Sequence, residues 1–406
     1  MKIKMNLELS VNDAVRVATI IGQEIPEIEA AIQNEPQLAY LYAKNVVGCR
    51  TPRLEKIIQK DPDTAYQYSS FVLRERWPEA EPTILTDPWV TLQYYQYHFR
   101  KERWPEAEEI FINPKYAFHY EYFNNIKKPK KQNVRYPDLE HKILKNDDSH
   151  LALSYVEIMN LGRNEILEPL IMKDPNTADV YARSTINGRW PEAEPTILTK
   201  PHTALSYTKS FIKDRWPEAE PIILTSPEHS YWYTYFLKNE CDKQRWPEAE
   251  PIILTSPIWA ERYAHDIIGG RWPEAEPIIK TEPSAAFFYT QQVLKERWPE
   301  AESTIIEDKT YAYHYARFIM QKRWPELEAR IISDAHYAEM YSKDVIKGRW
   351  LEAEPAILES QYATDYMKRN RTDNMPKSIK ALKKYYIKTN PYLQLIADIQ
   401  ELSLAE

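Results

Sequence analysis

The fold is decided by the stretch RWPEAEPIILTSP at residues 215–227, which returns letter for letter at residues 245–257. Its opening hexapeptide RWPEAE recurs along the chain, beginning at Arg76, Arg103, Arg189, Arg271 and Arg297, with looser copies at Arg323 and Arg349. From Trp246 onwards the motif tryptophans are 26 residues apart. Self-similarity at a fixed period of this length is typical of a repeat array.

A second periodic feature lies in the half of each unit that follows the tryptophan motif. In residues 257–269 (PIWAERYAHDIIG), small or apolar side chains recur at the spacing of an amphipathic helix, at Ala260, Tyr263, Ala264, Ile267 and Ile268. Aligning the units on this stripe places a tyrosine in every one, at Tyr42, Tyr68, Tyr94, Tyr120, Tyr155, Tyr181, Tyr207, Tyr233, Tyr263, Tyr289, Tyr315, Tyr341 and Tyr366. Most steps are 26 residues, so we count about thirteen units.

Capping residues mark where this helix begins and ends. Ser226-Pro227 and Asp61-Pro62 each predict an N-cap followed by a proline in the first turn. Gly269 and Gly348 predict the end of the helix before the next Arg-Trp pair. The second half of each unit is therefore a helix with defined ends.

The first half of each unit predicts another helix, with two alternative starts. Pro78 and Pro82 are four residues apart, so they cannot both take the first helical position. Either the first turn is irregular, or the helix begins after Pro78 with Pro82 in its first turn. Trp77 precedes a proline and is expected to be extended. The glutamates that follow it suit the positive end of a helix.

These helical hairpins predict the architecture of the whole chain. A hairpin of about 26 residues cannot bury its own apolar stripe, so neighbours must stack. We expect an all-α fold, an α-solenoid of about thirteen hairpins that forms a curved superhelix. The expected parts are an N-terminal capping helix in 1–24, the repeat solenoid in 25–366 with a basic loop insertion near 124–135, and a basic C-terminal capping segment in 367–406. Residues 392–404 are apolar enough to cover the last repeat.

Composition excludes several classes of function. A net charge of −7 argues against general, charge-driven binding to nucleic acid or to anionic membranes. The two cysteines supply no disulfide framework and fit a reducing compartment. No apolar run resembles a signal peptide or approaches the length of a membrane span. We therefore expect a soluble, cytoplasmic protein that does not engage a membrane.

The tandem RWPEAEP units that alternate with Ala-x-x-Tyr-Ala helices resemble repeat proteins predicted in the genomes of tailed bacteriophages. The resemblance covers roughly residues 25–366 and rests on a specific tandem hexapeptide. It implies a phage origin and the cytoplasm of the bacterial host, but no chemistry. More distantly, the stacked hairpins are similar to HEAT and tetratricopeptide arrays, most of which bind other proteins. That similarity concerns architecture alone.

The periodic aromatic residues are expected to anchor the repeats. The motif tryptophans are Trp77, Trp104, Trp190, Trp216, Trp246, Trp272, Trp298, Trp324 and Trp350. We expect them, together with the one tyrosine of each unit, to form the core. The alternative for the tyrosines is a row of phenols that lines a concave groove.

No residue pattern predicts catalysis. A catalytic pair of acids occupies one special environment, whereas the Glu-Ala-Glu pairs recur in every intact unit. We expect these glutamates at helix starts, with the motif arginines pairing across units. The nine histidines show no metal-ligand spacing, and the chain has no nucleophile elbow, phosphate loop or dinucleotide fingerprint. We predict no catalytic residue, no cofactor and no metal.

Two basic clusters interrupt the acidic background. One contains Lys127, Lys128, Lys130 and Lys131, and the other contains Lys377, Lys380, Lys383 and Lys384. A solvated loop and a solvated tail explain both. Alternatively, they attract phosphate while nearby exposed aromatic side chains, Trp89, Trp232 and Trp259, stack on bases.

Three hypotheses of function follow. The first is a non-catalytic scaffold or inhibitor that binds a protein, with a host defence protein as a target if the gene is phage-borne. Near-identical units differ at positions expected to be exposed, such as Glu261-Arg262, Gln291-Gln292 and Lys343-Asp344. The second is nucleic-acid or nucleotide binding through the basic clusters, and the third is a structural component of a phage particle.

Overall fold

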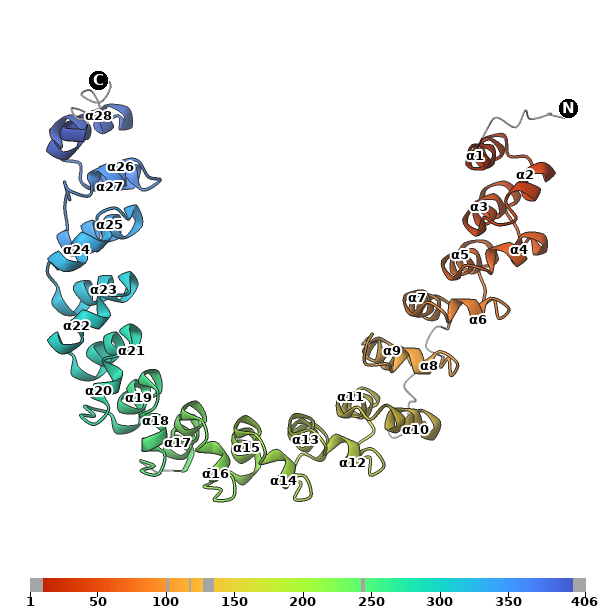
Figure 1. Ribbon diagram of the computed structural model, residues 1–406, viewed down its shortest axis with the longest axis horizontal. Helices are drawn as coiled ribbons and strands as arrows, with labels where there is room; N and C mark the ends of the chain where they lie inside the picture. Colours follow the sequence, from red (N-terminus) through yellow and green to blue (C-terminus); the bar gives the residue numbers. More distant parts are fainter. Residues whose placement is uncertain (1–9, 100–101, 117, 127–134, 242–244, 397–406) are drawn as a thin grey trace. The chain divides into compact units, whose positions relative to one another are not determined.

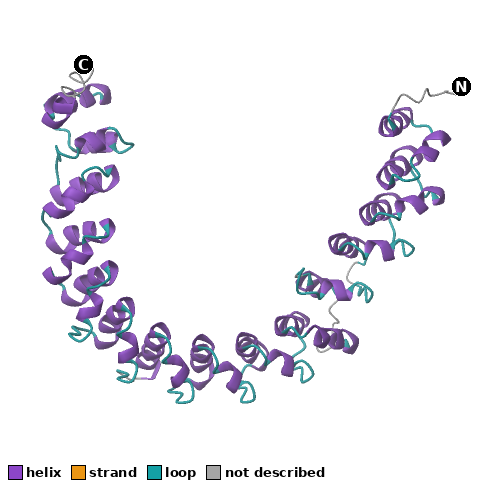
Figure 2. Cartoon of the chain, in the orientation of Figure 1, coloured by secondary structure: helices purple, strands orange, loops and turns teal. Residues whose placement is uncertain are grey.

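The computed structural model describes residues 10–99, 102–116, 118–126, 135–241 and 245–396. Every regular element in these ranges is a helix, and no strand occurs among them (Figure 2). No described helix has both the length and the apolar character that a membrane crossing requires. The residues form two compact units, Met1–Ile197 and Leu198–Glu406.

The first unit opens with α1 (Val11–Ile21), which is capped by the Ser10 side chain. The helices that follow the tryptophan motif, here called first helices, are α2 (Pro26–Ala31), α4 (Pro52–Ile58), α6 (Glu81–Ile84), α8 (Glu108–Phe111), α10 (Pro137–Asn146), α12 (Glu168–Ile171) and α14 (Glu194–Ile197). The second helices are α3 (Pro36–Tyr42), α5 (Pro62–Tyr68), α7 (Pro88–His98), α9 (His119–Asn125), α11 (Ser149–Met159) and α13 (Pro175–Tyr181). Successive second helices pack together, α3 on α5, α5 on α7, α9 on α11 and α11 on α13 (Figure 1).

The second unit repeats this alternation. Its first helices are α16 (Glu220–Ile223), α18 (Glu250–Ile253), α20 (Glu276–Ile279), α22 (Pro299–Ile305), α24 (Pro325–Ile331) and α26 (Glu354–Leu358). Its second helices are α15 (Pro201–Tyr207), α17 (Pro227–Cys241), α19 (Pro257–Tyr263), α21 (Pro283–Phe288), α23 (Lys309–Tyr315), α25 (Ala335–Tyr341) and α27 (Ala363–Arg369), followed by α28 (Ile379–Thr389). Neighbouring second helices from α15 to α25 contact one another in chain order.

The second proline of the motif accompanies a late helix start, although α8 also begins late, at Glu108, with Glu109 in the place of that proline. Where the motif has a second proline, as at Pro82, residues 78–80 form an isolated turn and α6 starts only at Glu81. Pro82 has no N–H to bond the carbonyl of Pro78, so the α-helical pattern cannot run through the motif. Where Ser303 replaces that proline, α22 starts at Pro299. The structure thus combines the two alternatives at this motif: residues 78–80 form an irregular turn, and α6 begins after Pro78 with Pro82 in its first turn.

Most second helices end in a π-helical turn. These turns are η1 (Ala43–Val47), η2 (Ser69–Leu73), η3 (Ala182–Ile186), η4 (Thr208–Ile212), η5 (Ala264–Ile268), η6 (Tyr289–Leu294), η7 (Ala316–Met320) and η8 (Ser342–Ile346). Gly269 closes η5 in the left-handed conformation at φ 72° and bonds the carbonyl of Ala264 at 2.9 Å. The expectation for Gly348 is off by one residue, because Lys347 takes the left-handed position at φ 58°.

Candidate functional site

The repeated motif builds a hydrogen-bonded network, seen clearly at Arg245, Trp246, Glu250 and Tyr263. Arg245 donates twice to Glu250, from Nε to Oε1 at 2.8 Å and from Nη2 to Oε2 at 2.9 Å. The Tyr263 hydroxyl donates to Glu250 Oε1 at 3.1 Å and accepts the backbone N–H of Trp246 at 3.0 Å. Burial raises the pKa of Tyr263 above its usual range. The hydroxyl therefore stays protonated and able to donate.

The same network recurs in both units. It forms around Arg50, Arg76, Arg163, Arg271, Arg297, Arg323 and Arg349. In each case the arginine binds a glutamate five residues further on, within its own hairpin repeat. The expected pairing across repeats is found at Arg103, which also binds Asp138 of the next repeat. The main partner of each arginine nevertheless lies within its own hairpin, because the turn after the tryptophan brings the second glutamate of the motif back to it. That glutamate is a structural acceptor.

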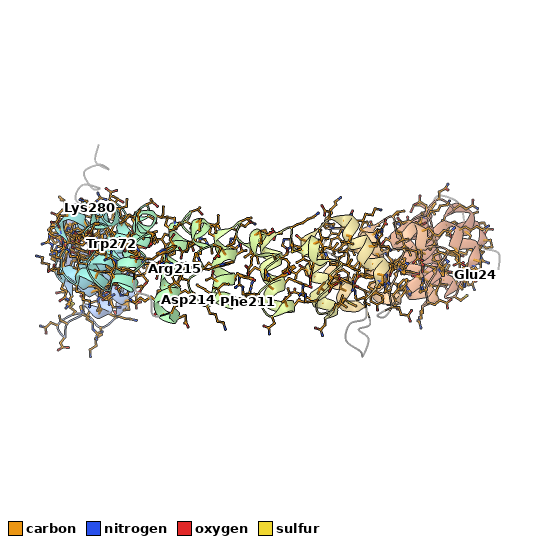
Figure 3. All side chains as sticks on the ribbon, turned by 90° about the horizontal axis from the view of Figure 1, so that it is seen from below. Glu24, Phe211, Asp214, Arg215, Trp272 and Lys280 are labelled. Atoms are coloured by element: carbon orange, nitrogen blue, oxygen red, sulfur yellow. The ribbon has the colours of Figure 1, made fainter. Side chains whose placement is uncertain are left out.

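The first glutamate of the motif makes a weaker contact between neighbouring hairpin repeats. Arg215 Nη2 lies 3.7 Å from Glu248 Oε1, and the Glu248 side chain is exposed. Arg215 and Asp214 lie together on the segment that precedes α16 (Figure 3). Exposed ion pairs contribute only about 0–1 kcal/mol each. These glutamates therefore set the charge of the surface more than the stability of the fold.

The structure buries the motif tryptophans and all but one of the periodic tyrosines. Each motif tryptophan is at most 5% exposed, and twelve of the tyrosines are fully buried. The exception is Tyr120, which is 50% exposed, while Tyr122 is fully buried and donates to Glu108 Oε1 at 2.6 Å. The expectation at Tyr120 is therefore wrong. Residues 114–116 form a turn and α9 begins only at His119, so the buried position moves two residues along the chain.

Exposed large apolar side chains gather on the second helices. In the first unit they are Phe71, Trp89, Tyr97 and Tyr120, which belong to η2, α7 and α9. In the second unit they are Tyr235, Ile258, Phe288 and Phe318, which belong to α17, α19, α21 and η7. Of the described residues between 25 and 366, only Ile166 adds an exposed large apolar side chain outside a second helix. Between residues 25 and 366 the exposed apolar surface therefore lies mainly along the second helices, and further exposed apolar side chains lie on α1 and on and after α28.

An aromatic cluster joins α17 to α19. The ring of Trp259 lies 5.3 Å from that of Tyr231 and 6.3 Å from that of Trp232. Arg262 lies over Trp259 at 4.9 Å, and the Tyr231 hydroxyl donates to Asp266. The two tryptophans are half-buried by these contacts. They are therefore less available for base stacking than the sequence indicates, whereas Trp89 is 62% exposed.

The second basic cluster lies on and just before α28. Leu382 and Tyr386 on one side of this helix are fully buried, and Tyr386 packs against the ring of Tyr366 at 6.1 Å. The helix that covers α27 is thus the basic α28, whereas Tyr392 is 43% exposed and residues 397–406 lie outside the described residues. The exposed lysines are Lys377, Lys380, Lys383 and Lys384. The first cluster (Lys127, Lys128, Lys130 and Lys131) also lies outside the described residues.

One carboxylate is placed differently from its expected position on the surface. Glu261 is only 5% exposed, and its Oε1 has no hydrogen-bond partner among the described residues. The three residue pairs compared above are not equivalent either, since Glu261 precedes its repeat tyrosine whereas Gln292 and Asp344 follow theirs. At this position other repeats carry Tyr, Phe or Leu, but also Asp179 and Glu339, so its burial could not be read from the residue type alone.

Within the described ranges, no group of His, Cys, Asp and Glu side chains is arranged to hold a metal ion. No protein-family model matches the chain, and no curated protein and no solved structure is detectably similar to it. The assignment of a function therefore depends on the surfaces described above.

Proposed function

We propose that this chain is a non-catalytic scaffold that binds another protein. In this proposal the hairpins form one α-solenoid of about thirteen units of about 26 residues. The ordered packing of second helices within each unit supports it. So does the hydrogen-bonded network, which holds each first helix to its second helix in the same way from repeat to repeat.

The observation that carries the proposal is where the apolar surface lies. Between residues 25 and 366, all but one of the exposed large apolar side chains among the described residues occupy the second helices, while the first helices expose mainly Glu, Pro and Thr. Aromatic side chains are enriched at protein interfaces and dominate their binding energy. A repeated frame that presents different side chains on one kind of helix is how repeat proteins build a binding surface.

The acidic pairs do not support an enzyme. The second glutamate of each pair is occupied by an arginine and a tyrosine, and the first is exposed on the surface. We therefore assign no catalytic residue. By resemblance to the repeat proteins of tailed phages, we propose that the partner is a bacterial host protein, with a defence protein as one such target, in the host cytoplasm.

Substitution of the apolar surface tests this function. Tyr235, Ile258, Phe288 and Phe318 would be changed together to serine in the tagged full chain, which would then be used to capture proteins from a bacterial lysate. We expect one stoichiometric protein with the natural chain and none with this variant. The matched control changes four exposed residues of the first-helix segments, Glu248, Glu274, Lys280 and Glu300, to serine.

Circular dichroism of both variants shows whether the helices remain intact. If the apolar variant keeps its helices and still captures the partner, the second helices are not the binding surface. If the control variant loses the partner and the apolar variant retains it, the first helices bind instead, and our assignment of the surface is wrong.

One observation favours nucleic-acid binding as a second candidate. No acidic side chain among the described residues lies within ion-pair distance of Lys380, Lys383 or Lys384. If these lysines contact phosphates of a single strand, each contact contributes about 0.7 to the steepness of log affinity against log salt. Changing all three to glutamine should therefore reduce that steepness by about 2. An unchanged slope in fluorescence anisotropy with a single-stranded oligonucleotide contradicts this candidate.

A further inference from the structure

Adjacent second helices of the second unit meet in a constant register. The residue two before the buried tyrosine of one hairpin contacts the residue three after the buried tyrosine of the next. Tyr231 donates to Asp266 at 2.5 Å, Tyr313 donates to Asp344, and Glu339 pairs with Arg369. We call these the leading position and the trailing position. These three pairs join groups that complement each other in hydrogen bonding or charge, whereas the same register assigns apolar residues to both positions at Leu205 and Phe236 and at Phe287 and Phe318.

Glu261 occupies the leading position of α19, but the chain supplies no partner for it. By this register, the trailing position of the hairpin after Glu261 is Gln292 of η6. The equivalent position in the hairpin after Glu339 is Arg369. No hydrogen bond joins Glu261 to Gln292 or to any other described side chain, and its Oε1 is buried. A buried carboxylate without a partner is costly, because burial removes its hydration without replacing it.

The charged groups around Glu261 do not compensate it. Burial, with a further contribution from Asp266, raises the pKa of its carboxyl to about 7, and Arg262 opposes this shift. Lys238 of α17 is bound to the carbonyl oxygens of Asp266 and Ile267. Neither α21 (PSAAFF) nor η6 (YTQQVL) contains a charged residue, and the acidic side chains of α18 and α20 are bound to arginines.

We propose that Glu261 receives a guanidinium or ammonium group from an arginine or lysine of the protein partner. This inference rests on the proposed function and names the chemistry that the partner must supply. The chain itself shows that a leading-position glutamate takes a guanidinium, since Glu339 binds Arg369. At Glu261 the trailing position of the next hairpin carries Gln292 and no guanidinium, so a basic side chain of the partner would take that place.

The surface around Glu261 suits such a partner. Ile258 lies three residues before Glu261, on the same side of α19, and is 43% exposed. Phe288 of the adjacent α21 is 37% exposed. Apolar contacts at these residues would exclude water from the ion pair and thereby strengthen it. A partner with a basic side chain next to an apolar one therefore fits this part of the surface.

A selection with a random peptide library, displayed on ribosomes and applied to the full chain, tests the proposal. We expect the selected peptides to contain arginine or lysine and to bind Glu261→Gln on the order of tenfold to a hundredfold more weakly, as expected for the loss of a charge-assisted hydrogen bond. Gln292→Arg should weaken binding similarly, because it supplies an internal guanidinium to Glu261. The matched control Glu339→Gln should leave binding unchanged.

The outcomes separate this inference from the proposed function. Peptides that bind Glu261→Gln and Gln292→Arg as tightly as the natural chain, yet lose binding when Phe288 is changed to serine, overturn the role of Glu261 and leave the protein-binding function intact. If no peptide is selected, or if binding ignores both Glu261 and Phe288, this part of the surface does not bind proteins and both proposals fail here.

Discussion

Changing Glu261 to glutamine is expected to stabilise the second unit in alkaline solution and to have little effect in acid. Burial and the neighbouring Asp266 raise the pKa of Glu261 from its usual 4.5 to about 7. The folded protein thus holds this proton more tightly than the unfolded chain does. The corresponding stability is fully present below about pH 4.5 and is lost as the pH rises through about 7.

The size of the effect follows from the same two values. Their difference, 7 − 4.5, is about 2.5 pH units. At about 1.4 kcal/mol for each unit, ionised Glu261 costs about 3 kcal/mol above pH 7. Glutamine has a similar shape and cannot ionise, so Glu261→Gln avoids this cost. At pH 5, where natural Glu261 is mostly protonated in the folded state, most of this cost is absent and the two proteins should differ by less than about 1 kcal/mol.

Hydrogen exchange followed by mass spectrometry suits this test, because opening in a repeat array is local. The two proteins would be compared at the same pH, at pH 5 and at pH 8. At pH 8, amides of α19 and η6 should exchange up to about a hundredfold more slowly in Glu261→Gln, as about 3 kcal/mol requires. In the control Glu339→Gln, loss of the pair with Arg369 should make exchange faster.

Equal exchange of the natural chain and Glu261→Gln at both pH values would refute the reasoning. It would mean that Glu261 is ionised at no cost, and therefore that it already has a partner or ready access to water. Faster exchange of Glu261→Gln at pH 8 would show that the ionised carboxylate stabilises the fold, which is the opposite sign.

The other predictions concern the repeated network and are measured by urea denaturation unless stated. Tyr263→Phe removes the hydroxyl that joins a buried backbone N–H to a carboxylate, so it should cost about 1–3 kcal/mol, whereas the exposed Tyr235→Phe should cost little. Trp272→Ala leaves a cavity in the core and should cost about 3–5 kcal/mol. The hydrogen bond from Arg271 lowers the pKa of Glu276, so the stabilisation by this carboxylate is present above its usual pKa of 4.5 and is lost as the pH falls further. Arg271→Gln should therefore be less sensitive to acid, as followed by circular dichroism.

The sequence predicted the helix pairs well because the signals are local. Proline after Asp61 marks the start of α5, and the Asp61 side chain accepts the N–H of Thr64 at 2.9 Å. The apolar stripe around Tyr263 gives the buried face of α19, where Ala260 and Ala264 are fully buried. Such features involve residues a few positions apart, and their physical basis requires no distant partner.

Other features were not accessible to this reasoning. The π-helical turn at η5 differs from an α-helical turn by one residue over a single turn, so the apolar spacing cannot distinguish the two. The shift from Tyr120 to Tyr122 depends on where α9 begins after an irregular turn. Two tyrosines so close together in sequence are equally good candidates for the buried position until that start is known.

The sequence by itself determined that the chain is built from helices, where most of them begin, and which aromatic side chains are buried. These depend on proline, on capping residues and on helical periodicity, all of which act within a few residues. Only the tertiary structure decided that each motif arginine binds the glutamate of its own hairpin, and that Glu261 is buried rather than exposed. Those contacts depend on the register between adjacent helices, which arises from packing and leaves no mark on the periodicity of a single repeat.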